Sequence, residues 1–87
     1  MLKNYMEDVV ENMLPTIIHE YKDICKCEKC IEDIKAIALN GLKPAYTVTD
    51  KGHMYNKINE LKSQFNIDVI NEITKAVGIV SKNSKHE

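Results

Sequence analysis

The sequence lacks any apolar run that approaches the about 18 to 20 residues a membrane-spanning helix needs. Its first stretch carries acidic residues early and has no apolar segment of the kind found in signal peptides, as the letters MLKNYMEDVVENML show. Low-complexity segments and internal repeats are lacking too. These absences predict a cytoplasmic protein that does not insert into a membrane.

A surplus of positive charge is also lacking. Lysine and arginine together number 12 against 13 acidic residues, so the formal net charge is −1. Proteins that bind nucleic acid without sequence preference need a basic surplus to displace the counterions of the phosphate backbone. Nucleic acid is therefore not an expected partner, and a DNA-binding adaptor is the weakest functional class that the sequence allows.

The chain is short, with 87 residues. A chain of this length buries only roughly 60–65% of the surface that it exposes when unfolded. Small domains commonly gain stability from disulfides, a metal ion or a second copy of themselves. The hydrophobic fraction of 44% and the charged fraction of 29% are normal for a globular domain and argue against disorder of the whole chain. We expect one domain over residues 1–82 and a polar tail over residues 83–87.

Hydrophobic periodicity predicts a mainly α fold with three to four helices. Apolar side chains recur every three to four residues over residues 3–22, where Pro15 predicts either a kink or two abutting helices. A second helix is predicted over residues 28–40, ended by an Asn-Gly pair. A third covers residues 54–80, either as one long helix or with a break after which Asn66 caps a new helix.

One short extended segment is predicted between the second and third helices. Residues 45–49 are rich in β-branched and aromatic side chains. Because no second strand is predicted in the chain, this segment is either merely extended or paired with the same segment of another copy. The second alternative fits a symmetric homodimer, which enlarges the core of a small chain. At the start of the first helix, Asn4 is the predicted N-cap and Glu7 its capping-box partner.

Three cysteines within six residues are the most specific chemical signal. Cys25, Cys27 and Cys30 form the pattern C-x-C-x-x-C beside the start of a predicted helix. Zinc prefers thiolate ligands, a helix N-terminus stabilises negative sulfur, and a reducing compartment favours a metal site over a disulfide. The cluster therefore predicts zinc as cofactor. The alternatives are reduced cysteines without a metal, or a redox pair of Cys27 and Cys30, for which the usual βαβ context is missing.

Three thiolates leave a tetrahedral zinc site one ligand short, and the chain has no fourth cysteine. The fourth ligand is then a histidine, a carboxylate, water or a cysteine from another molecule. His19 is the histidine nearest to the cluster in sequence and is the first candidate for this ligand; alternatively, it is a half-buried histidine of the first helix with no metal-binding role. His53 and His86 are further candidates. Catalysis would also need a general base and a substrate cleft, for which Glu28 alone is close, so we expect no enzyme.

The residues around the cluster resemble a known family. The pattern Asn4-x-x-Glu7-x-x-Val10 is followed by Cys25-x-Cys27-x-x-Cys30-x-x-Asp33-Ile34-x-Ala36-x-Ala38-Leu39-Asn40-x-Leu42-x-Pro44-x-Tyr46. Over residues 1–80 the chain is similar to the ComFB family of late competence development proteins. The resemblance implies a small, mostly helical homodimer encoded beside the machinery for DNA uptake, with other competence proteins as partners and zinc held by the three cysteines.

Relatives in other bacteria look like receptors for cyclic dinucleotides, which implies a second candidate function. Such a ligand needs cations, hydrogen-bond donors and an aromatic face. Asn40, Lys43, Tyr46 and Lys51 offer these groups around the end of the second helix and the extended segment, and a homodimer duplicates them about its two-fold axis. The alternative is that Asn40 caps the helix, Tyr46 packs in the core and both lysines are solvated.

Together these features predict a non-enzymatic, zinc-binding, homodimeric accessory or regulatory protein associated with late competence and DNA uptake. The alternative function is a receptor that binds c-di-GMP or c-di-AMP at or near the dimer interface.

Overall fold

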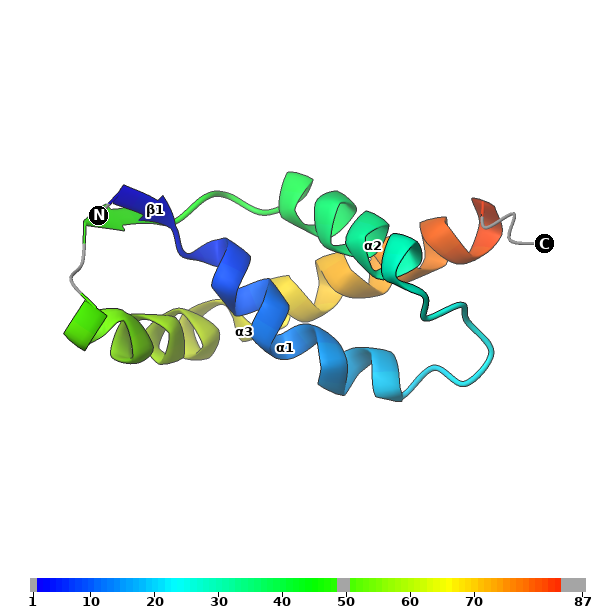
Figure 1. Ribbon diagram of the computed structural model, residues 1–87, viewed down its shortest axis with the longest axis horizontal. Helices are drawn as coiled ribbons and strands as arrows, with labels where there is room; N and C mark the ends of the chain where they lie inside the picture. Colours follow the sequence, from blue (N-terminus) through cyan, green and yellow to red (C-terminus); the bar gives the residue numbers. More distant parts are fainter. Residues whose placement is uncertain (1, 49–50, 84–87) are drawn as a thin grey trace.

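The computed structural model describes residues 2–48 and 51–83 of the chain. It is mainly helical, as the sequence predicts, with a small two-stranded sheet at one end (Figure 1). The elements follow in the order β1 (Leu2–Asn4), α1 (Met6–His19), α2 (Glu28–Asn40), β2 (Tyr46–Val48) and α3 (Lys51–Asn83). No helix within the described ranges is both long and apolar enough to cross a membrane.

The three helices pack against one another, with α3 running along the whole molecule (Figure 1). The core forms where their apolar stripes meet. It contains Tyr5, Met6, Val9, Val10, Met13, Leu14, Ile18, Ile34, Ala38, Leu61, Val69, Ile73, Ala76 and Val77. The first half of α3 lies at the same end of the molecule as the sheet, and the molecule is elongated, with extents of 43 × 21 × 19 Å (Figure 1).

α1 is shorter than its apolar period predicts. It spans Met6–His19 rather than residues 3–22, because the residues before it form β1. Pro15 lies inside this single helix, so the prediction of two abutting helices is wrong. Pro15 and Glu11 are both exposed. The helix hydrogen bond that proline removes is therefore on the solvent side, where water can donate to the carbonyl of Glu11.

The extended segment pairs within its own chain. β1 and β2 are antiparallel, with Leu2 opposite Val48, Lys3 opposite Thr47 and Asn4 opposite Tyr46. The prediction of an extended segment is confirmed, whereas the prediction that the chain holds no second strand is wrong. Residue 49, the last of the predicted segment, lies outside the described residues.

Asn4 joins the sheet to the start of α1. Its side-chain Oδ1 accepts the backbone N–H of Met6 at 3.1 Å and that of Ala45 at 2.9 Å. The backbone N–H of Tyr5 also donates to the carbonyl of Ala45 at 3.0 Å. Tyr5, not Asn4, occupies the N-cap position, and no side chain caps the helix. The predicted capping box with Glu7 is therefore wrong, although Asn4 still binds the first helical N–H.

α3 is divided by a kink. Phe65 has φ −113° and ψ 19°, values outside the helical range, and helical segments lie on both sides of it. Both sequence-based alternatives were partly correct, since the helical run continues to Asn83 but bends one residue before the predicted break at Asn66.

α2 ends where the sequence predicts, at Asn40, and Gly41 follows as its C-cap. Gly41 has φ −90°, which any residue can adopt, so glycine is not required here for its backbone freedom. A Cβ added at Gly41 would meet Oε1 of Glu72 on α3, which is the far end of a flexible side chain and can move aside. The end of α2 therefore lies beside the second half of α3.

Candidate metal centre

The cysteine cluster lies at the connection between α1 and α2, at the end of the molecule opposite the sheet (Figure 1). Cys27 is the N-cap of α2, with the extended backbone φ −70° and ψ 163°. Cys30 follows in the first turn and is only 1% exposed. It begins the buried stripe of α2 that continues through Ile34 and Ala38. Cys25 is half-buried and Cys27 is exposed, so the cluster reaches from the buried face of α2 to solvent.

The three thiols are gathered closely enough to hold one ion. Their Sγ atoms all lie within 4.8 Å of one another, and none of them is in a disulfide. Sulfurs bonded to one tetrahedral zinc at about 2.3 Å are about 3.8 Å apart. The separations therefore need only small side-chain adjustments to accept zinc or another soft divalent ion. The donor set, three thiolates, fits the metal that the sequence predicts.

The local environment favours negative sulfur at Cys27. The backbone N–H of Cys30 donates to its Sγ at 3.5 Å, within range for a sulfur acceptor. This hydrogen bond, followed by one from the Cys25 side chain, lowers the pKa of the Cys27 thiol below its usual value. Lys29 lies two residues further on and pairs with Asp33 at 3.0 Å. That carboxylate raises the pKa of Lys29 and keeps it cationic.

The structure does not add a fourth residue to this group. Among the described residues, the group of ligand atoms within 4.8 Å of one another consists of the three cysteines. His19 is exposed at the last position of α1, and its role as fourth ligand stays a prediction. His53 lies in the first turn of α3, at the far end of the molecule (Figure 1). His86 lies outside the described residues.

The residues predicted for nucleotide binding lie near the sheet and the end of α2. Asn40 is the exposed last residue of α2, and Lys43 is exposed in the connection that follows. Tyr46 is on β2 and is 63% exposed, so it does not pack in the core of this chain. Lys51 is the first residue of α3, and its side chain is not among those that the structure describes. Binding by these residues stays a prediction.

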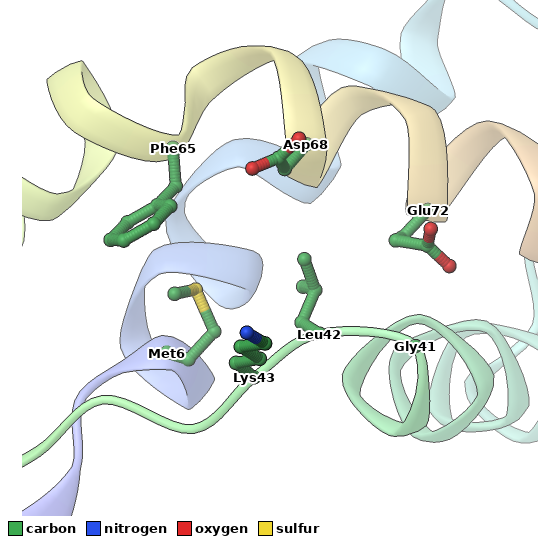
Figure 2. Close-up of a pocket in the computed structure, with 7 residues that line it drawn as sticks. All are labelled: Met6, Gly41, Leu42, Lys43, Phe65, Asp68 and Glu72. Atoms are coloured by element: carbon green, nitrogen blue, oxygen red, sulfur yellow. The ribbon is translucent and has the colours of Figure 1, made fainter.

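Lys43 lines a pocket of about 340 Å³ between the end of α2 and the kink of α3 (Figure 2). Phe65 and Met6 form its apolar end, while Asp68 and Glu72 project from α3, as Figure 2 shows. The two carboxylates were not predicted as neighbours of Lys43, because they are distant in sequence and meet it only through the packing of α2 on α3. They disfavour a phosphate at this position.

The fold and the cluster define a class, a small three-helix protein with a thiol-rich candidate metal site. Comparisons identify the family. Residues 3–84 match the family model described as late competence development protein ComFB. Competence protein ComFB of Bacillus subtilis is 27% identical over 82 residues, which cover 94% of this chain and 84% of that protein.

A solved structure agrees with this assignment. It is described as the structural characterization of the late competence protein ComFB from Bacillus subtilis. It is 28% identical and superposes with a TM-score of 0.82, covering 98% of this chain and 96% of that one. The chain belongs to the ComFB family, which confirms the resemblance seen in its sequence.

Proposed function

We propose that this protein is a non-enzymatic, zinc-binding, homodimeric accessory or regulatory protein of late competence. The observation that carries the proposal is the cluster of three Sγ atoms within 4.8 Å at the start of α2. The link to competence rests on membership of the ComFB family. Partners among other competence proteins follow from the same link.

Zinc suits the cluster because all three donors are soft thiols, and because a hydrogen bond from the backbone of Cys30 lowers the pKa of the Cys27 thiol. In the proposed site, Cys25 and Cys27 hold the ion from the α1–α2 connection and Cys30 holds it from the buried face of α2. Bound zinc would contribute a Lewis-acidic centre and a cross-link between these segments. A structural use of the metal is favoured because sites rich in thiolate are typically structural rather than catalytic.

The zinc proposal is tested by the metal content of the purified full-length protein. We expect close to one zinc per chain in mass spectrometry of the native protein, and loss of most of it in Cys25→Ser, Cys27→Ser and Cys30→Ser. Ser63→Ala is a matched control, since Ser63 is exposed on α3. Wild-type protein that holds no zinc after purification under reducing conditions would contradict the proposal. His19→Gln in the same series tests whether that side chain is needed.

A homodimer is supported by an exposed apolar face of the sheet. Leu2 lies opposite Val48 in the register and therefore shares its face, as does Tyr46 two residues earlier. These three side chains are 68%, 74% and 63% exposed. Adjacent apolar side chains on a sheet face are a common mark of a protein–protein contact. A second copy that covers this face would also extend the small core.

The homodimer is tested by sedimentation equilibrium. Val48→Lys places a charge on the proposed interface and is expected to shift the protein toward monomer. Thr16→Lys adds the same charge on the exposed face of α1 and should leave the mass unchanged. A wild type that remains monomeric at high micromolar concentration would refute the homodimer.

A second candidate function is a cyclic-dinucleotide receptor, and the exposure of Tyr46 favours it. The ring is 63% exposed in the single chain and belongs to the face proposed to meet a second copy, so a base would stack on it at or near the dimer interface. We expect calorimetry to show binding of c-di-GMP or c-di-AMP that is weakened in Tyr46→Ala. No heat and no thermal shift with either nucleotide would exclude this function.

A further inference from the structure

The pocket beside the kink of α3 has an apolar end that can hold a small side chain. Its volume of about 340 Å³ is near the lower limit of the range of about 300–1,000 Å³ that is typical of small-molecule sites. Met6, Leu42 and Phe65 supply the apolar surface (Figure 2). Met6 is 2% exposed, and Leu42 and Phe65 are half-buried. An apolar group that enters this end therefore leaves water for a surface that borders the core.

Two opposite charges line different sides of the same pocket. Lys43 belongs to the connection after α2, and Asp68 belongs to α3 on the other side of the space (Figure 2). Both side chains are exposed. Within the described part of the chain, neither of them makes a hydrogen bond or an ion pair. A positive and a negative group thus border one cavity without being joined to each other.

The remaining charged group of the lining, Glu72, is already paired. Its Oε1 lies beside Gly41, and its Oε2 pairs with Lys75 at 3.1 Å. Its charge is therefore offset by a lysine that is not among the residues lining the pocket. The charges of Lys43 and Asp68 then sum to zero. A ligand with a charge of one sign only would meet one group of its own sign, whereas a ligand with both charges can satisfy both groups.

We propose that this pocket binds a free α-amino acid with an apolar side chain. The ammonium group of the ligand pairs with Asp68, its carboxylate pairs with Lys43, and its side chain enters the apolar end beside Phe65. The bound molecule joins the connection after α2 to α3 at the kink. This site shares no residue with the cysteine cluster or with the exposed face of the sheet, so the proposal does not depend on zinc or on the homodimer.

The test is calorimetry of the full-length protein with L-leucine, L-methionine and L-phenylalanine. We expect saturable binding of at least one of them. The tightest binder is then compared with the amine that lacks its carboxylate, with the acid that lacks its ammonium group, and with glycine, which lacks the apolar side chain. For L-leucine the first two are 3-methylbutylamine and 4-methylpentanoic acid. Each of the three should bind more weakly by about threefold or more, because each loses one contact.

Substitutions of the two charged residues test whether the ligand occupies this pocket. Asp68→Asn and Lys43→Gln each replace an exposed charged side chain with a neutral polar one, and each should weaken binding by about threefold or more. Asp23→Asn and Lys22→Gln make the same changes at exposed positions of the α1–α2 connection, at the end of the molecule opposite the sheet (Figure 1). These two control variants should bind as wild type does.

Each outcome supports or overturns the proposal. Absence of saturable heat from all three amino acids overturns it. An amine or an acid that binds as tightly as the amino acid shows that one charge is sufficient, which overturns the pairing with both residues. Wild-type affinity in Asp68→Asn and Lys43→Gln places the ligand elsewhere and also overturns the proposal. Binding that weakens in both variants and not in the controls supports it, whatever the zinc content or the oligomeric state of the protein.

Discussion

We predict that the side chain of Asn4 contributes about 2 kcal/mol to the free energy of unfolding, because it makes two hydrogen bonds and the loss of one buried or half-buried hydrogen bond typically costs about 1 kcal/mol. Its Oδ1 accepts two backbone N–H groups, from Met6 at 3.1 Å and from Ala45 at 2.9 Å. Alanine at this position cannot accept either of them. Both N–H groups are then left half-buried, and the sheet loses its tie to the start of α1.

The measurement is urea unfolding followed by circular dichroism, at one protein concentration for all variants because dimerisation would change the apparent stability. Asn4→Ala should lower the unfolding midpoint with an unchanged m-value. Asn4→Asp keeps an acceptor oxygen and should retain most of the stability. Asn12→Ala, on the exposed face of α1, controls for loss of an amide. An Asn4→Ala variant within about 0.5 kcal/mol of wild type would refute the reasoning.

Three further predictions use the same protein. Ile73→Ala removes a fully buried side chain and should cost about 2–5 kcal/mol in urea unfolding, whereas Ile67→Ala, at a position that is 72% exposed, should cost less than about 1 kcal/mol. Pro15→Ala restores a helix N–H inside α1 and should raise the stability by about 1 kcal/mol or more. Metal-free protein treated with iodoacetamide should be alkylated first at Cys27, because its lowered pKa keeps the thiolate populated to lower pH. Mass spectrometry of the alkylated peptides across pH checks this, and equal rates at all three cysteines would contradict it.

Local sequence signals predicted much of the fold. The bounds of α2 were predicted correctly because a stop signal and an apolar stripe agree over residues 28–40. The cysteine cluster was predicted because its members lie within six residues, so any compact turn brings them together. Its position at the start of α2 follows from the same local pattern.

Pairings between distant residues were not predictable from local signals. β1 contains Lys3 and Asn4, which have no strand preference, and it is a strand only because β2 lies beside it. The helical period of α1 also extends backward over these residues, which favoured helix. Likewise, the approach of Gly41 to Glu72 depends on how α2 crosses α3, and no spacing along the chain indicates it.

The pairing of β1 with β2 also affects the order in which the protein can fold during synthesis. The sheet joins residues 2–4 to residues 46–48, so it closes a loop that contains all of α1 and α2. Both strands and both helices therefore leave the ribosome before α3. Five core residues belong to α3, namely Leu61, Val69, Ile73, Ala76 and Val77. A chain that has emerged from the ribosome only as far as residue 48 would have the apolar faces of α1 and α2 without their cover from α3, which is a state prone to aggregation.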